Sequence, residues 1–172
     1  MVKDEARQER FRELVQQHRG IVHKVTATYC FDRADRNDLA QEILAQLWRS
    51  FSRYDADRPF TTWMYRVALN VAISYVRSTV RRQRHTVPLD EERHDIGEAD
   101  TQDLELETRI HALHRFIAAQ NDLDRALLLL YLEDHSYREI AEIIGISETN
   151  VGTKVNRLKQ RIRISLQLLP TL

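Results

Sequence analysis

The stretch "SYREIAEIIGISETNVGTKVNR", residues 136–157, decides the fold of the C-terminal part of the chain. Ser136 followed by Glu139 has the spacing of a capping box, which satisfies free backbone amides at the start of a helix. Gly145 tolerates the left-handed conformation that ends a helix, and Ser147 is a suitable N-cap for the next one. The stretch therefore predicts two helices joined by a tight turn.

Small and β-branched residues lie where these two helices must approach each other. Ala141 lets the backbones come close, Gly145 follows at the turn, and Val151 lies on the second helix. These residue types at these offsets are typical of a helix-turn-helix. The exposed side of the second helix could then read DNA, because amides and hydroxyls address base edges while Arg and Lys bind guanine or phosphate. The alternative is an amphipathic helix whose polar face is only solvated.

Charge divides the chain into three parts, although its 172 residues have a formal net charge of zero. Residues 1–85 carry a net charge of +6, residues 86–107 carry −8, and residues 108–172 carry +2. Pro88 and Gly97 interrupt the acidic part, which has the composition of a flexible linker. We predict an N-terminal helical domain over 1–85, an acidic linker over 86–107 and a C-terminal helix-turn-helix domain over 108–172.

Helical periodicity recurs along nearly all of the chain, so the predicted fold class is all-α. A helix beginning near Asp35 or Asn37 is expected to bury Leu39, Ile43, Leu44, Leu47 and Trp48. The other expected helices span 4–29, about 60–80, 104–119, 122–133, 137–144 and 148–168.

Aromatic and arginine residues alternate over "WRSFSRYDADRPFTTWMYRVALNVAISYVRSTVRRQR", residues 48–84. Unstacked bases pack on aromatic rings while arginines follow the phosphate backbone, so this composition favours contact with an opened strand. The alternative is a core role for the rings, because Trp63, Val67 and Val71 share one stripe.

Other features give no reason to expect an enzyme, a cofactor or a metal. His111 and His114 have a spacing compatible with metal binding, but no convincing ligand set completes them, and a surface pair is the simpler interpretation. Cys30 is read as a small apolar residue in a reducing compartment. With no apolar run long enough to span a membrane and no signal-peptide core, we expect a soluble, cytoplasmic protein.

Two blocks together carry a resemblance to a known family. "DLAQEILAQLWRSFSRYDADRPFTTWMYRVALNVAISYVR", residues 38–77, precedes the acidic segment, and "YLEDHSYREIAEIIGISETNVGTKVNRLKQRIR", residues 131–163, follows it. Their order and spacing closely resemble the extracytoplasmic-function group of bacterial sigma factors.

The resemblance implies a function and three groups of contact residues. It implies a promoter-specificity subunit that binds core RNA polymerase, recognises the duplex −35 and melted −10 elements, and is sequestered by an anti-sigma factor. Contacts with core polymerase are implied for Asp38, Gln41, Glu42 and Trp48. Contacts with the −10 element are implied for Tyr54, Arg58, Thr62, Trp63, Arg66, Asn70 and Arg77. Contacts with the −35 element are implied for Ser147, Thr149, Asn150, Thr153, Lys154, Asn156 and Arg157.

The recognition helix departs from the family pattern at one position. Many members have Thr-Val-Lys/Arg-Ser-Arg where this chain has Asn-Val-Gly-Thr-Lys, residues 150–154. Gly152 thus replaces a basic side chain, which removes a candidate DNA contact and leaves the −35 sequence preference open.

Two other classes of function compete with the sigma-factor hypothesis. An autonomous helix-turn-helix regulator would share the C-terminal features but leave the aromatic and arginine block unexplained. A metal-dependent enzyme on a helical scaffold would need His111 and His114 to bind a metal.

Overall fold

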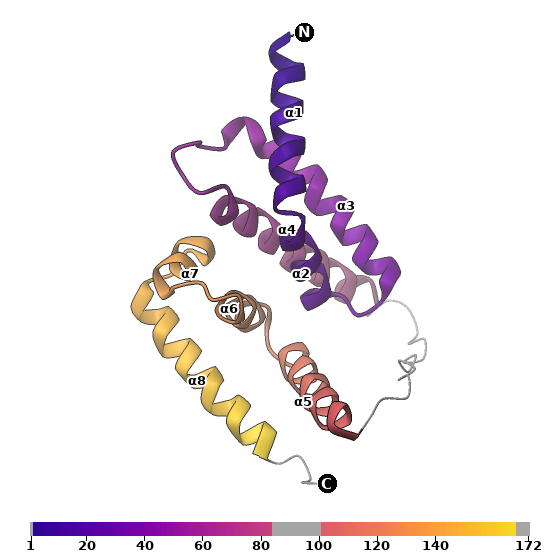
Figure 1. The fold of residues 1–172 in the computed structure, drawn as a ribbon, viewed down its shortest axis with the longest axis vertical. Helices are drawn as coiled ribbons and strands as arrows, with labels where there is room; N and C mark the ends of the chain where they lie inside the picture. Colours follow the sequence, from indigo (N-terminus) through magenta and orange to yellow (C-terminus); the bar gives the residue numbers. More distant parts are fainter. Residues whose placement is uncertain (1, 84–100, 168–172) are drawn as a thin grey trace.

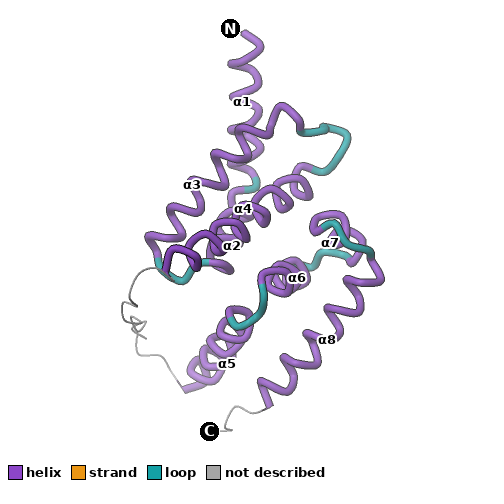
Figure 2. The backbone as a smooth tube through the Cα atoms, turned by 180° about the vertical axis from the view of Figure 1, so that it is seen from behind, coloured by secondary structure: helices purple, strands orange, loops and turns teal. Residues whose placement is uncertain are grey.

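A computed structural model of the chain describes residues 2–83 and 101–167. These ranges are helical and contain no β-strand (Figures 1 and 2), which confirms the all-α prediction. The elements are α1 (Val2–Gln17), α2 (Arg19–Tyr29), α3 (Arg33–Ser50), the short 3₁₀ helix η1 (Phe51–Arg53), α4 (Phe60–Gln83), α5 (Thr101–Ala118), α6 (Asp122–Leu132), α7 (Tyr137–Ile144) and α8 (Glu148–Gln167).

The first predicted helix is divided in two, which corrects the continuous helix expected over 4–29. The break lies at His18, whose φ of −111° and ψ of 20° are not helical. His18 also packs against Phe60, with 5.7 Å between the ring centroids. The weak helix former Gly20 follows the break. The N-terminal end of α1 projects beyond the other helices (Figure 1), whereas Phe11 in its second half packs against Trp48 of α3.

Helix α3 begins earlier than the sequence pattern suggested, because Asp32 caps it. The Asp32 carboxylate accepts hydrogen bonds from the backbone N–H groups of Ala34 (2.7 Å) and Asp35 (3.1 Å). Most of the predicted apolar face is confirmed, because Leu39, Ile43 and Leu47 are fully buried.

Two residues of that predicted face are not part of the core. Leu44 is 37% exposed and Trp48 is only half-buried. The buried face of α3 is therefore narrower than the pattern suggested. It packs against α2 and α4 to form the centre of the N-terminal half.

Helix α6 is the most buried helix of the C-terminal half. Its five consecutive residues 126–130 are all buried, and the helix packs against α5, α7 and α8. Its N-cap is Asn121, whose side chain accepts a hydrogen bond from the Asp124 backbone N–H at 2.9 Å.

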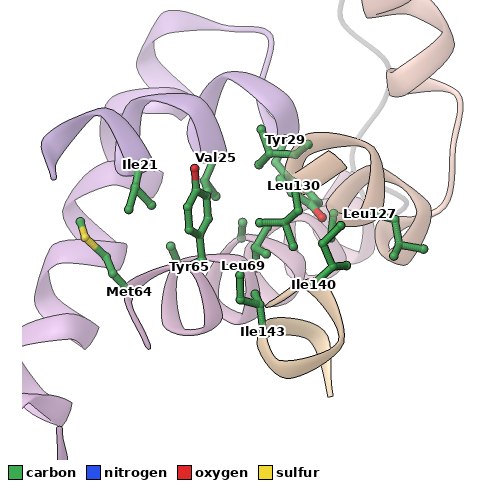
Figure 3. Close-up of a cluster of buried hydrophobic side chains, with 14 of the residues drawn as sticks. Ile21, Val25, Tyr29, Met64, Tyr65, Leu69, Leu127, Leu130, Ile140 and Ile143 are labelled. Atoms are coloured by element: carbon green, nitrogen blue, oxygen red, sulfur yellow. The ribbon is translucent and has the colours of Figure 1, made fainter. Parts of the chain in front are cut away.

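The two halves share one continuous apolar core. Helix α4 packs against α7, and α2 packs against α6. Figure 3 shows Tyr65 and Leu69 of α4 beside Leu130 of α6 and Ile140 and Ile143 of α7, and all five are buried. The two predicted domains are thus in direct contact.

The predicted acidic linker is only partly covered by the structure. Residues 84–100 lie outside the described residues, whereas α5 begins at Thr101 and so includes the last part of the segment predicted as linker. Across the described helices, none has a stretch long and apolar enough to cross a membrane. The same described residues contain no group of three or more His, Cys, Asp or Glu placed to hold a metal, and His111 and His114 are both exposed.

Candidate nucleic-acid interface

Helix α7 starts with the predicted capping box. The Ser136 backbone N–H and hydroxyl both donate to Glu139 Oε2 at 2.8 Å, and the Glu139 backbone N–H donates to Ser136 Oγ at 3.2 Å. These hydrogen bonds favour the charged carboxylate, so they lower the pKa of Glu139. The start of α7 is thereby fixed by two side chains that are three residues apart.

The turn between α7 and α8 uses the predicted glycine. Gly145 has φ 83° and ψ 36°, and its N–H donates to the Ala141 carbonyl at 2.8 Å. The Ile146 N–H donates to the same carbonyl at 3.3 Å, which satisfies a carbonyl left free at the helix end. Ser147 Oγ then accepts from the Asn150 N–H at 3.2 Å and caps α8. The helix-turn-helix predicted from the sequence is therefore formed.

Helix α8 has one buried and one polar face. Val151, Val155 and Leu158 are buried against the domain. The residues implied to contact the −35 element lie off this buried stripe, and all are exposed except the half-buried Lys154: Ser147, Thr149, Asn150, Thr153, Lys154, Asn156 and Arg157. Ser147 Oγ accepts the capping hydrogen bond, which leaves its O–H group to donate to an acceptor such as a phosphate oxygen.

Gly152 faces the first helix of the motif. A Cβ atom built at this position would lie 3.5 Å from two ring carbons of Tyr137, which is ordinary van der Waals contact. The first atom of a side chain here would therefore meet α7. The position at which many family members have a basic residue therefore lies beside the Tyr137 ring in this chain.

Two basic residues in the second half of α8 pack on aromatic rings of neighbouring helices. Lys159 Nζ lies 5.4 Å from the ring centroid of Tyr131, and the Arg161 guanidinium carbon lies 5.8 Å from that of Phe116. Cation–π contacts of this kind hold a charge at the surface while tying α8 to α5 and α6. The sequence alone does not indicate these pairs, because the partners are far apart along the chain.

The aromatic residues before and within α4 form a cluster. Tyr54 and Trp63 have ring centroids 5.2 Å apart, and Phe60 and Trp63 are 5.4 Å apart. Phe60 and Tyr65 are buried, whereas Tyr54 and Trp63 are half-buried. The core interpretation is confirmed for Phe60 and Tyr65, whereas Tyr54 and Trp63 pack against the core and retain partly exposed faces, so their contact with an opened strand stays a prediction.

The polar residues implied to contact the −10 element divide into two sets. Arg66 and Asn70 are exposed and Thr62 is half-buried. Asn70 lines a groove of about 610 Å³ between α3 and α4. By contrast, Arg58 Nη1 lies 3.6 Å from a carboxylate oxygen of Glu142, and Arg77 Nε donates to Asp122 Oδ2 at 3.1 Å.

The residues implied to bind core polymerase lie on α3. Asp38, Gln41 and Glu42 are exposed, and Glu42 lines the same groove as Asn70. Trp48 is different, because its ring packs edge-on against Phe11, with 5.1 Å between centroids. Trp48 therefore helps to hold α1 against α3, and only the exposed part of its side chain could contact a partner.

Comparisons with known proteins agree with this arrangement. Residues 14–82 match the family model Sigma-70 region 2, and residues 111–162 match the family model Sigma-70, region 4. The chain is 30% identical over 166 residues to the ECF RNA polymerase sigma-E factor of Haemophilus influenzae, a match that covers 91% of this chain and 87% of the relative.

Two solved structures have a similar fold. The structure of CnrH in complex with the cytosolic domain of CnrY has a TM-score of 0.68 and 19% identity, and the match covers 95% of this chain and 91% of that one. The sigma factor RpoE in complex with the anti-sigma factor NepR, from Bartonella quintana, has a TM-score of 0.68 and 18% identity over 92% of this chain and 99% of that one. The two matched regions and the relative at 30% identity identify the family: the chain belongs to the ECF group of sigma-70-type RNA polymerase sigma factors.

Proposed function

We propose that this chain directs core RNA polymerase to promoters by reading the −35 element with α8 and the melted −10 element with the loop and helix from Tyr54 to Arg77. The observation that carries the proposal is the presence, in one chain and in order, of both sigma-70 regions, the second with a formed helix-turn-helix and an exposed polar face on α8. An autonomous regulator needs only the second of these regions.

The exposed groups of α8 and of the aromatic cluster suit the DNA-binding roles that we assign to them. The exposed amides and hydroxyls of α8, on Thr149, Asn150 and Asn156, suit base edges in a major groove. The partly exposed rings of Tyr54 and Trp63 suit stacking with unpaired bases, worth about 1–3 kcal/mol per base.

The same proposal includes two protein partners and a location. The exposed carboxylates and amide of α3, on Asp38, Gln41 and Glu42, bind the core polymerase. An anti-sigma factor binds and sequesters the chain, in keeping with the complex that the structurally similar RpoE forms with the anti-sigma factor NepR. The protein works in the cytoplasm, where the polymerase is.

A matched pair of asparagine variants tests whether α8 reads the −35 element and α4 binds the melted −10 element. We compare Asn156→Ala on α8 with Asn70→Ala on α4, and we use Gln17→Ala as an exposed-amide control outside both faces. Each variant is assembled with core polymerase and assayed by run-off transcription on a promoter that the unchanged protein selects from a library. This promoter is used in two forms, as a full duplex and as a template already unpaired at the −10 element.

The expected defects differ between the two templates. Asn156→Ala should lower transcription on both, by the equivalent of about 1–3 kcal/mol for a lost base contact. Asn70→Ala should impair transcription more on the duplex than on the pre-melted template, because its contribution is to strand opening. Equal defects of Asn70→Ala on both templates, or no defect of either variant relative to Gln17→Ala, would contradict the assignment.

A further inference from the structure

A row of aromatic rings runs from α1 to the start of the loop between η1 and α4. Phe11 of α1 packs edge-on against Phe51 of η1, with 5.1 Å between the ring centroids and 64° between the ring planes. Phe51 stacks in turn on Tyr54, at 5.9 Å and 14°, and its centroid lies 6.1 Å from that of Trp63 on α4. Phe11 is therefore one ring away from both of the partly exposed rings that we assign to unpaired bases.

The loop that begins at Tyr54 is folded by its own hydrogen bonds. The Tyr54 hydroxyl donates to the Arg58 carbonyl at 2.8 Å. The Arg58 N–H donates to the Asp55 carbonyl at 3.1 Å, and the Asp57 N–H donates to Asp55 Oδ1 at 3.1 Å. Because the Tyr54 side chain closes this loop, a residue that fixes the Tyr54 ring also fixes the loop.

Phe11 lies outside the part of the chain that matches Sigma-70 region 2, which begins at residue 14. Its half-buried ring also packs edge-on against Trp48, at 5.1 Å and 61°, so α1 lies against the end of α3 (Figure 1). Aromatic pairs prefer particular edge-on or offset arrangements, unlike aliphatic contacts. Phe11, itself held by Trp48, therefore restricts the tilt of the Phe51 ring.

We propose that Phe11 is a positioning residue for promoter melting. It holds Phe51, and through Phe51 it keeps the rings of Tyr54 and Trp63 in the orientation in which they accept unpaired bases. Phe11 itself touches no base. The inference rests on the proposed function, because it concerns how the −10 element is captured, whereas the ring packing is present in the free chain.

A ring that is already held loses little freedom when a base stacks on it. Side chains that become immobilised on binding weaken that binding, and preorganisation removes this cost. Loss of the Phe11 ring would leave Phe51 without one of its ring neighbours, so that Tyr54 and Trp63 gain freedom where bases stack. The alternative is that Phe11 only fills the core, in which case its loss lowers stability without a specific effect on strand opening.

Tryptophan fluorescence tests the ring packing without DNA or polymerase. The chain has 2 tryptophans, and Trp48→Phe leaves Trp63 as the single one while keeping a ring beside Phe11. In this full-length background we compare Phe11→Leu with Phe11→Tyr, which keeps the ring. The matched control is Leu14→Ala, because Leu14 is another half-buried residue of α1 and the substitution removes the same number of carbon atoms as Phe11→Leu. Circular dichroism shows that each variant is folded at the temperature used.

Time-resolved fluorescence anisotropy measures how freely the Trp63 ring moves on the nanosecond timescale. Phe11→Leu should increase the amplitude of the fast decay, because Phe51 is no longer held on the side of α1. Phe11→Tyr and Leu14→Ala should leave that amplitude unchanged.

Run-off transcription with core polymerase tests the consequence for strand opening, in chains that keep Trp48. The templates are the selected promoter as a full duplex and the same promoter already unpaired at the −10 element. Phe11→Leu should lower the ratio of duplex to pre-melted transcription by about two- to tenfold, the size expected for one lost ring–ring contact. Phe11→Tyr and Leu14→Ala should keep the original ratio. In a chain that carries Trp63→Leu, Phe11→Leu should lower the ratio less, because residues that act through each other are not additive.

A Phe11→Leu variant that behaves like Leu14→Ala in both measurements would overturn the inference, and so would faster motion of Trp63 with an unchanged transcription ratio. Fully additive losses from Phe11→Leu and Trp63→Leu would assign Phe11 to the core instead. The anisotropy needs neither promoter nor polymerase. If the chain directed no transcription at all, the proposed function would fail, while the anisotropy would still show whether Phe11 holds Trp63.

Discussion

Two glycine-to-alanine substitutions in the helix-turn-helix should change stability in opposite directions. Gly152 lies inside α8, where glycine costs about 0.8–1.0 kcal/mol relative to alanine. The added methyl group would lie 3.5 Å from the Tyr137 ring, an ordinary contact that requires no rearrangement. Gly152→Ala should therefore stabilise the protein by roughly 1 kcal/mol, equivalent to about 2–4 °C in the midpoint of thermal unfolding.

Gly145→Ala should be destabilising, although the added methyl group would meet no side chain or distant backbone atom within 4 Å. Its φ of 83° is unfavourable for alanine by about 1–2 kcal/mol. Gly145→Ala should therefore lower the midpoint by a few degrees. Thermal unfolding followed by circular dichroism measures both variants. A loss of stability in Gly152→Ala would refute the placement of its Cβ beside Tyr137, and a gain in Gly145→Ala would refute the left-handed turn.

Three further substitutions or treatments give distinct expected results. Glu139→Gln should lower the free energy of unfolding at pH 7. The pKa of Glu139 in the folded protein is depressed below its ordinary value of 4.5, so the stability difference between the two proteins should shrink as the pH falls from 4.5 through the folded-state pKa. A stability difference that does not depend on pH would contradict the capping role. Burial raises the pKa of the Cys30 thiol to about 11, so Cys30 should resist iodoacetamide at pH 8 until the protein is unfolded. Rapid alkylation of the folded protein would contradict the burial of this thiol. Arg157→Ala should weaken binding of the polymerase complex to −35 duplex DNA and reduce the slope of log affinity against log salt by about 1, whereas an unchanged slope would show that Arg157 makes no phosphate contact.

Local sequence signals were sufficient for the helix-turn-helix. The capping box at Ser136 and Glu139 and the turn at Gly145 depend on residues that are close together in the chain, so their spacing alone predicts the geometry. The end of α3 near Trp48 was less predictable, because periodicity cannot distinguish a half-buried ring from a buried one. That distinction depends on Phe11, which reaches Trp48 from another helix.

Contacts between distant segments account for what the sequence did not reveal. The break at His18 involves a ring contact with Phe60, 42 residues later. Likewise, nothing near Arg77 in the sequence indicates that it pairs with Asp122 across the two halves. The roles assigned to individual DNA- and polymerase-binding residues remain predictions, because they concern partners outside the chain.

The assignment of promoter recognition to this chain is tested most directly with purified bacterial core RNA polymerase and a promoter library. We expect the chain to co-purify with the core enzyme and run-off transcripts to appear only when both are present. Failure to bind the core enzyme, together with a tight two-fold-symmetric footprint of the chain alone on duplex DNA, would contradict it.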